Sequence, residues 1–126
     1  MRVLVDTCAF LWWATGDPHL SPRALEVLEN PESDLFFSVA SGWEMALKMD
    51  RLGFIEDFDM LLDRATRILR LSIMAVDVKH VIASARLPFH HRDPFDRVLI
   101  AQALMDGIPI LSKDAAFSQY PIRVIW

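Results

Sequence analysis

The chain has 126 residues, 53% of them hydrophobic, and a formal net charge of −4 at pH 7. This length predicts one domain with one core, residues 1–126, and the acidic balance excludes a nucleic-acid binder that relies on bulk positive charge. The single cysteine, Cys8, excludes an internal disulfide and a zinc site made of cysteines alone. The apolar surplus suggests a surface covered by another chain, although a large core explains it almost as well.

The N-terminal stretch "MRVLVDTCAFLWWATGD" is rich in apolar residues but lacks the pattern of a signal peptide. Asp6 interrupts its apolar run, and no signal-type cleavage site stands out. No apolar run in the chain approaches the roughly 18 residues that span a bilayer. We therefore expect a cytoplasmic protein with no membrane contact.

Short apolar strands alternate with helices along the chain. Residues 2–5 form a run typical of a strand buried on both faces, and a helix over 8–14 follows. Ser21 and Pro22 predict the cap and first residue of the next helix, which should end before Pro31. Further strands are expected over 34–39, 72–76, 108–114 and 122–126, and further helices over 41–53, 57–71, 77–87 and 93–107. This alternation predicts an α/β sandwich around a mostly parallel sheet.

Four carboxylates fall near strand ends. Asp6 directly follows the first strand, and Glu44 lies in the helix that follows the 34–39 strand. Asp96 lies in the first turn of the helix that leads into the 108–114 strand, and Asp114 closes that segment. Because ligands of open parallel sheets bind outside the carboxyl ends of the strands, these side chains could meet at one edge of the sheet.

Such a convergence would require a cation. Carboxylates within about 4–6 Å of one another cannot all stay ionised without one. Oxygen ligands without His or Cys favour Mg²⁺ or Mn²⁺ over Zn²⁺. A site of this kind suits phosphodiester hydrolysis, since the metal activates a water and neutralises charge on the phosphate.

Each carboxylate also has an ordinary structural explanation. Asp6 is compatible with a turn that ends a strand. Glu44 is compatible with an i,i+4 pair to Lys48, worth about 0.3–0.5 kcal/mol on a helix surface. Asp114 is compatible with the cap of a short helix over 115–118. The residues alone leave these alternatives open.

The segment "DPFDRVLIAQAL" separates Asp93 from Asp96. Asp93 before Pro94 predicts the helix cap and places Asp96 at the third helical position, where it could reciprocate in a capping box and favour the helix dipole. Asp96 also heads a stripe that continues through Ile100 and Ala103, so its side chain belongs to a buried face.

The chain resembles PIN-domain proteins of the VapC toxin type, the ribonuclease half of a toxin–antitoxin pair. Four segments carry the resemblance, in family order and over nearly the whole chain: "VLVDTCAFLWW", "SVASGWEMALK", "HRDPFDRVLIAQAL" and "PILSKDAAF". The resemblance implies a PIN-like three-layer α/β/α sandwich and a Mg²⁺- or Mn²⁺-dependent endoribonuclease that uses a water activated by the metal.

The resemblance also implies residue roles. Asp6 and Asp96 match the main metal ligands of the family, and Glu44 and Asp114 match the acidic residues that complete the site. The positions that match its supporting residues are Thr7, Asp93 and Ser112. The family commonly forms homodimers and is neutralised by a small VapB-like antitoxin, in some cases in a higher assembly, and the aromatic "FLWW" helix suits such contacts.

Basic residues and histidines lie next to these acids in the sequence. Candidate contacts to RNA phosphates are Lys48, Arg92, Arg97 and Lys113. Surface ion pairing is the alternative for each of the four. His90 and His91 precede the 93–107 helix and are expected in a solvated loop, with a base-contacting or general-acid role as the alternative.

Two other functions compete with the nuclease. A phosphatase of the haloacid dehalogenase type also begins with an aspartate at a strand end, but it requires a second aspartate two positions later, where this chain has Cys8. The other candidate is a PIN-fold interaction module without catalysis. The four filled acidic positions count against it.

Overall fold

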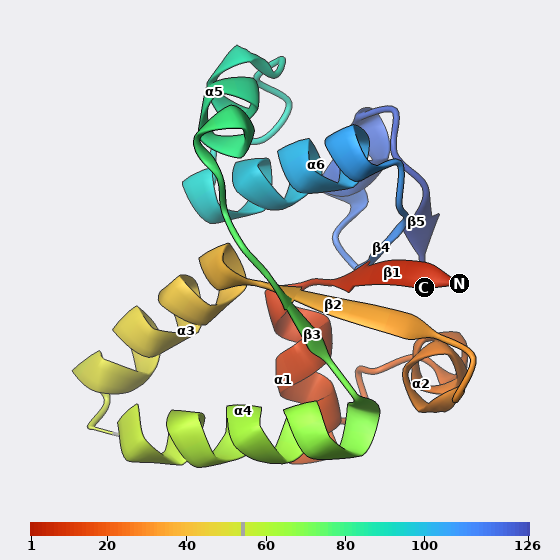
Figure 1. Ribbon diagram of the computed structural model, residues 1–126, viewed down its shortest axis with the longest axis vertical. Helices are drawn as coiled ribbons and strands as arrows, with labels where there is room; N and C mark the ends of the chain where they lie inside the picture. Colours follow the sequence, from red (N-terminus) through yellow and green to blue (C-terminus); the bar gives the residue numbers. More distant parts are fainter. Residues whose placement is uncertain (54) are drawn as a thin grey trace.

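The computed structural model describes residues 1–53 and 55–126 and contains a five-stranded sheet flanked by helices (Figure 1). The strands are β1 (Arg2–Val5), β2 (Asp34–Ser38), β3 (Ser72–Met74), β4 (Ile110–Leu111) and β5 (Val124–Ile125). They lie in the order β3-β2-β1-β4-β5, and every neighbouring pair is parallel. The predicted α/β class is confirmed, with a fully parallel rather than mostly parallel sheet.

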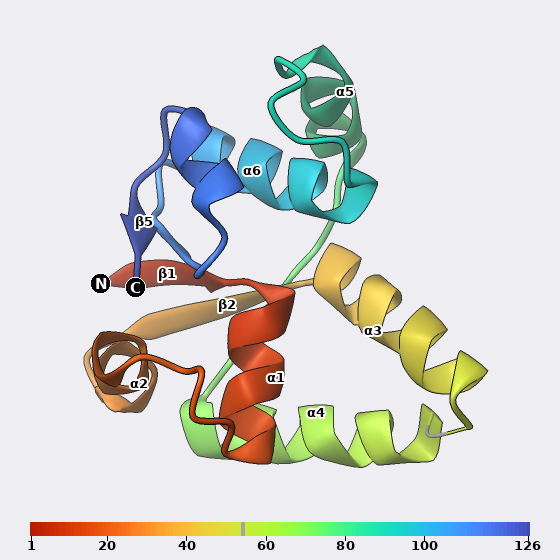
Figure 2. The same cartoon turned by 180° about the vertical axis from the view of Figure 1, so that it is seen from behind.

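Helices cover both faces of this sheet. They are α1 (Thr7–Thr15), α2 (Pro22–Glu29), α3 (Val39–Arg51), α4 (Ile55–Leu69), α5 (Val78–Arg86), α6 (Pro94–Asp106) and a short 3₁₀ helix, η1 (Ala115–Gln119). Helices α5 and α6 lie on one side of the sheet, and α1, α2 and α4 lie on the other (Figures 1 and 2). The three-layer arrangement implied by the resemblance is therefore observed. Within the described residues, no helix has the length and apolar character needed to cross a membrane.

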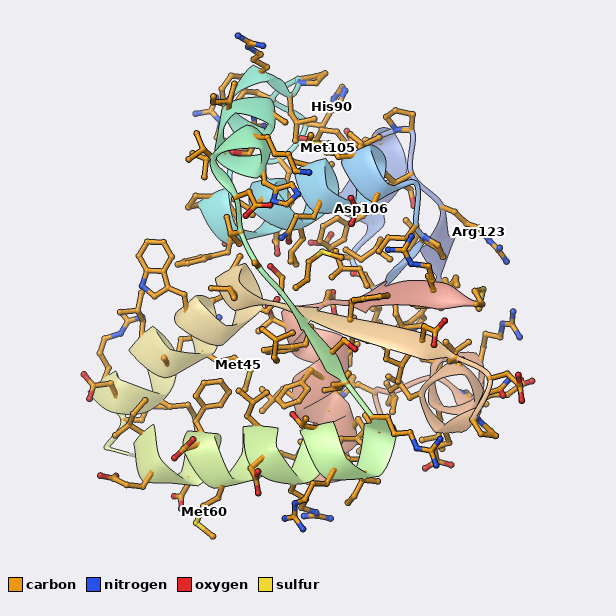
Figure 3. All side chains as sticks on the ribbon, viewed as in Figure 1. Met45, Met60, His90, Met105, Asp106 and Arg123 are labelled. Atoms are coloured by element: carbon orange, nitrogen blue, oxygen red, sulfur yellow. The ribbon has the colours of Figure 1, made fainter. Side chains whose placement is uncertain are left out.

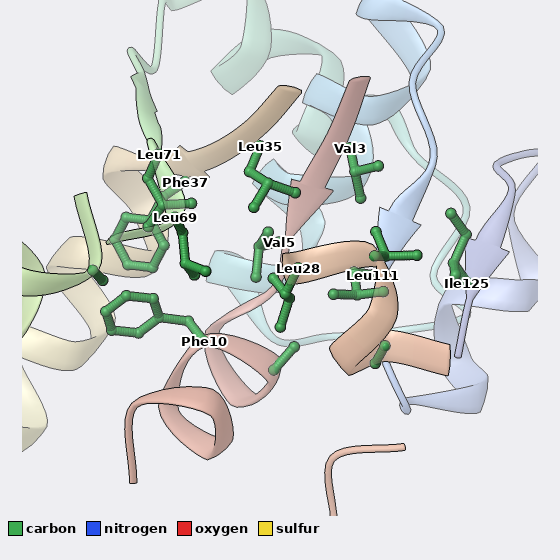
Figure 4. Packing of buried hydrophobic residues seen from close by; sticks show 14 of the residues in the cluster. Val3, Val5, Phe10, Leu28, Leu35, Phe37, Leu69, Leu71, Leu111 and Ile125 are labelled. Carbon is green, nitrogen blue, oxygen red and sulfur yellow. The ribbon is translucent and has the colours of Figure 1, made fainter. Parts of the chain in front are cut away.

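The alternation of side chains along β1 separates two hydrophobic clusters, one on each face of the sheet, where the sequence predicted a single core. Val3 and Val5 face the α1, α2 and α4 side, where they pack in one cluster with Phe10, Leu28 and other residues (Figure 4). Leu4 faces the opposite side and packs with α6. All three β1 side chains are fully buried. A strand covered on both faces needs apolar residues at every position, which is why "VLV" shows no polar alternation.

Local signals set the helix ends. The Ser21 hydroxyl accepts a hydrogen bond from the Ala24 N–H at 3.0 Å, and the helix begins with Pro22 as predicted. Gly16 and Gly107 follow α1 and α6 in the left-handed conformation, at φ 67° and 64°, which glycine adopts without steric cost. Both helices therefore end at a glycine.

Several element boundaries differ from the prediction, and β3 and β5 have three and two residues in place of the five expected for each. Helix α3 begins at Val39 rather than at 41, because the Ser38 hydroxyl accepts a hydrogen bond from the Ala40 N–H and caps it. Helix α4 spans 55–69 rather than 57–71. Strand β4 has two residues rather than seven, and it is preceded by Pro109, which has no N–H to donate to a neighbouring strand.

Candidate active site

The order of the strands reverses next to β1. The chain builds β2 and β3 outward on one side of β1 and then returns to place β4 and β5 on the other side. Val5 pairs with Leu111, so Asp6 and Ser112 are the next residues at the carboxyl ends of β1 and β4. A reversal of this kind opens a crevice outside the strand ends, where α/β proteins bind ligands.

A cavity of about 250 Å³ opens at this crevice. Its lining residues are Asp6, Thr7, Cys8, Trp12, Glu44, Lys48, Asp96, Lys113, Asp114 and Phe117. All four predicted carboxylates are among them, and each comes from a different part of the fold. The structure therefore brings together the set that the sequence proposed, and we call this space the acidic cavity.

Asp6 is the most buried of the four carboxylates, with 5% of its surface exposed. It caps α1 by accepting a hydrogen bond from the Ala9 N–H at 2.7 Å. Burial raises the pKa of Asp6 to about 6, hydrogen bonds from Ser112 and Ala9 oppose that rise, and the nearby Asp96 and Asp114 charges add to it. Asp6 is thus both a helix cap and a destabilised anion that a nearby cation would stabilise.

Asp93 and Asp96 have different roles, as their positions predict. The Asp93 carboxylate caps α6 by accepting from the N–H groups of Phe95 and Asp96 at 2.9 and 3.0 Å. The Asp96 carboxylate faces the acidic cavity and contacts His91 in place of the reciprocal capping contact. Burial and the Asp93 charge raise the pKa of Asp96 to about 6, although the His91 hydrogen bond opposes this rise.

Glu44 and Asp114 combine their ordinary roles with a place at the cavity. Lys48 Nζ lies 3.3 Å from a Glu44 carboxylate oxygen, so the predicted i,i+4 pair exists, but only 12% of the Glu44 side chain is exposed. Asp114 caps η1 by accepting from the Ala116 N–H at 2.9 Å. Its side chain is 46% exposed and forms the outer wall of the cavity.

Two of the predicted supporting residues, Ser112 and Thr7, place hydroxyl groups near this edge of the sheet. Ser112 is fully buried, hydrogen bonds to the Asp6 carboxylate and accepts from the Asp114 N–H at 3.0 Å. The Thr7 hydroxyl donates to the buried Ser41 hydroxyl at 3.0 Å, which joins α1 to α3. Ser41 was not among the predicted supporting residues, because nothing in the sequence indicates that its hydroxyl would meet that of Thr7.

The four basic candidates divide into three groups. Lys48 and Lys113 line the acidic cavity, and Lys113 Nζ lies 5.8 Å from the centre of the Trp12 ring. Arg92 is exposed but borders a separate apolar groove. The predictions for Arg97 are wrong. Its side chain is buried, so it is available neither for an RNA phosphate nor for a surface ion pair.

Arg97 instead holds the segment that leads into α6. Its guanidinium donates to four backbone carbonyls, those of Ser84, Leu87, Pro88 and His91, over distances of 2.6–3.0 Å. It also stacks on the Phe89 ring, 4.2 Å from the ring centre. Helical spacing within α6 could not reveal these partners, because they lie at the end of α5 and in the segment after it, whose path is set by the tertiary fold.

The structure also corrects the expectation for His91. Its side chain is only 20% exposed, and Nε2 lies 2.7 Å from Asp96 Oδ2 and 3.6 Å from Asp114 Oδ2. His90 is exposed, as expected for a solvated loop residue. The signal that could have identified His91 is its separation from Asp96 by only five residues, with a helix cap between them.

The donor chemistry fits a hard divalent cation. Ligand atoms of His91, Asp96 and Asp114 lie within 4.8 Å of one another, and the acidic cavity adds the carboxylates of Asp6 and Glu44. Carboxylate oxygens with room for water are the usual surroundings of Mg²⁺ in proteins. The raised pKa values of Asp6 and Asp96 indicate a site short of positive charge.

Comparisons with known proteins give a consistent result. The family profile described as "PIN domain" matches residues 3–122. The chain is similar in structure to VapBC2 from Rickettsia felis, solved with a promoter DNA fragment (TM-score 0.76, 14% identity, 98% of this chain and 97% of the other). It is also similar to DNA-bound VapBC from Salmonella typhimurium (TM-score 0.73, 16% identity, 98% and 96%) and to FitAcB from Neisseria gonorrhoeae (TM-score 0.67, 17% identity, 97% and 95%). No curated protein matches the sequence.

Replacing Asp6 with Asn should stabilise the metal-free protein at neutral pH. The pKa of Asp6 is about 6 in the folded protein and near 3.8 in the unfolded chain, so the folded state binds this proton more tightly. The proton therefore contributes its full share to the free energy of unfolding below about pH 4, and this contribution is lost as the pH rises to about 6. Asn keeps the cap and cannot ionise. In urea titrations with a chelator, the advantage of Asp6→Asn over the unsubstituted chain should grow by about 2–3 kcal/mol between pH 4 and pH 7.5. An advantage that does not change with pH would contradict the raised pKa.

Replacing Arg97 with Met should destabilise the fold much more than replacing Arg92. Met retains apolar bulk but leaves four carbonyl groups without their donor, so we expect a loss of at least about 3 kcal/mol in the free energy of unfolding. Arg92→Met, at an exposed position five residues earlier, should change it by less than about 0.5 kcal/mol. Equal effects in denaturant titrations would refute the structural role of Arg97.

Proposed function

Because the chain belongs to the PIN-domain family, we propose that it is a Mg²⁺- or Mn²⁺-dependent endoribonuclease and the toxin of a VapBC-type toxin–antitoxin pair. The observation that carries the proposal is the convergence of four carboxylates, from four parts of the chain, on one cavity at the strand reversal. The structural similarity to VapBC and FitAB proteins supports the toxin assignment. We further propose that the protein acts in the cytoplasm as a single domain.

The residues present fit the proposed cofactor. Asp6 and Asp96 would be the main ligands, and Glu44 and Asp114 would complete the set directly or through water. A divalent cation bound there supplies an activated water and offsets negative charge on the scissile phosphate. Ser112 and the α1 N-terminus hold the Asp6 carboxylate in one orientation through their hydrogen bonds.

The proposed RNA contacts are supported by position and charge. Lys48 and Lys113 line the cavity and could receive the phosphates on either side of the cleaved bond. Lys48 would shift from its pair with Glu44, and its side chain, 60% exposed, has room to do so. Trp12 lines the cavity as well, with its ring centre 5.8 Å from Lys113 Nζ, and offers an aromatic surface for a base.

The proposed partners are a VapB-like antitoxin and a second copy of the chain, with a higher assembly of both. Supporting them is an apolar groove of about 560 Å³ between α3, α5 and the start of α6. Trp43 and Phe89, on its walls, are 62% and 72% exposed, which is unusual for large apolar side chains. The "FLWW" segment contributes less than expected, since Phe10 is core and Trp12 lines the acidic cavity.

A non-catalytic interaction module is the competing function, and the apolar groove is the feature that favours it. Such a module would have no use for the buried, mutually repelling Asp6 and Asp96. Divalent-metal titration separates the two proposals, since a module without the site would show no saturable binding.

Asp96→Asn should abolish divalent-dependent RNA cleavage, whereas Asp93→Asn should retain it. Asn at 96 removes a charged ligand, but Asn at 93 still caps α6. Cleavage of a labelled RNA is measured with Mg²⁺, with Mn²⁺ and with a chelator, and Asp106→Asn, at the far end of the same helix, controls for charge (Figure 3). An active Asp96→Asn with an inactive Asp93→Asn would reverse the assignment.

The purified chain should have twice the 14.4 kDa mass of one copy, and Val81→Glu should convert it to a monomer. Val81 is 51% exposed on the wall of the apolar groove, so a charge there would have to be buried in a dimer. Met60→Glu, which changes an equally apolar exposed residue on α4, should leave the mass unchanged (Figure 3). Light scattering measures the mass of the unsubstituted chain and of both variants. A monomeric unsubstituted chain would contradict the proposed homodimer.

A further inference from the structure

His91 connects two acids that arrive from different parts of the fold. Its Nε2 lies 2.7 Å from Asp96 Oδ2, at the start of α6, and 3.6 Å from Asp114 Oδ2, after β4. An ionised carboxylate only accepts hydrogen bonds, so Nε2 must carry the proton in this contact. His91 is thus a single donor placed between two proposed ligands.

The backbone of His91 is fixed independently of its ring. Its N–H donates to the Tyr120 hydroxyl at 3.0 Å, and the same hydroxyl donates to the Pro88 carbonyl at 2.8 Å. Its carbonyl accepts from the buried Arg97 guanidinium at 3.0 Å. Because these contacts use main-chain atoms of residue 91, they survive a change of its side chain.

The adjacent histidine differs in every one of these respects. His90 is exposed and packs edge-on against the Tyr120 ring, 5.2 Å between ring centres, and Figure 3 shows it at the outer surface near α5. The chain therefore offers a matched pair of neighbouring histidines, of which only His91 contacts the acids. A general effect of histidine in this loop can be separated from an effect at the site.

His91 contacts the two acids without belonging to the lining of the cavity. Among the described residues, those that line the acidic cavity include Asp96 and Asp114 but not His91. Nε2 hydrogen bonds to Oδ2 of Asp96 and lies 3.6 Å from Oδ2 of Asp114, so it approaches one oxygen of each carboxylate. Partners of this outer kind fix the orientation of metal-binding carboxylates.

We propose that His91 is a positioning residue that holds the Asp96 and Asp114 carboxylates in the arrangement that binds the metal. The inference rests on the proposed function, since it concerns the same divalent-cation site. Without the ring, the repulsion between the two acids is unopposed and Asp114, which is half exposed, turns toward solvent. The metal then has to order both carboxylates as it binds.

The test is calorimetric titration of the metal-free protein with Mn²⁺ and with Mg²⁺. His91→Ala should weaken both metals by about 10–100-fold, the usual effect of removing an outer hydrogen-bond partner. His91→Gln, whose amide N–H reaches a similar position, should restore affinity to within about three-fold of the unsubstituted chain. His90→Ala should not change it. Thermal unfolding of each variant verifies the fold.

The possible failures are distinguishable. Metal affinity of His91→Ala within two-fold of the unsubstituted chain would overturn the positioning role and leave the proposed nuclease intact. If His91→Gln were as weak as His91→Ala, the imidazole nitrogen would itself be a ligand, which an amide nitrogen cannot replace, and the positioning role would be wrong. If the unsubstituted chain showed no saturable binding of either metal, the proposed metal-dependent function would fall and this inference with it.

Discussion

The burial of the Asp6 carboxylate at the strand reversal is the constraint on which the site depends. Desolvation opposes its charge, and the Asp96 and Asp114 carboxylates oppose it further. Two fixed donors, the Ser112 hydroxyl and the Ala9 N–H, only partly compensate. A protein that keeps this arrangement in place of a buried apolar residue gives up stability for a site whose negative charge would favour a bound cation.

The fold creates this situation through the register of its sheet. Pairing of Val5 with Leu111 brings Asp6 and Ser112 to the same edge, and the outward construction of the two sheet halves leaves a crevice there. Helices α1 and α6 then begin at that edge, so that Asp6 and Asp96 occupy the positive ends of two helix dipoles. Backbone geometry, rather than flexible loops, sets the separation of the main acids.

Much of this could be predicted from the sequence because the signals are local. Buried strands and helix caps identified the elements, and the position of Asp6 and Asp114 after parallel strands indicated that they could meet at one edge of the sheet. The resemblance to PIN-domain proteins was needed to favour a shared site over a turn or a helix cap. The roles of Arg97 and His91 could not be predicted in the same way. Their partners depend on the path of the 87–92 loop over α6, and a loop path is determined by long-range contacts such as that between Tyr120 and Pro88.

Arg97 shows how the charge of the site is maintained. It lies one residue after Asp96, and a guanidinium directed toward the cavity would neutralise the acids and compete with a metal ion. The guanidinium instead donates to four backbone carbonyls, so its hydrogen-bonding groups are satisfied without an ion pair. The two lysines at the cavity have flexible side chains, and that of Lys48 is 60% exposed, so neither provides a fixed counter-charge. The same residue that orders the loop carrying His91 therefore leaves the acidic cavity negative, as the proposed divalent cation would require.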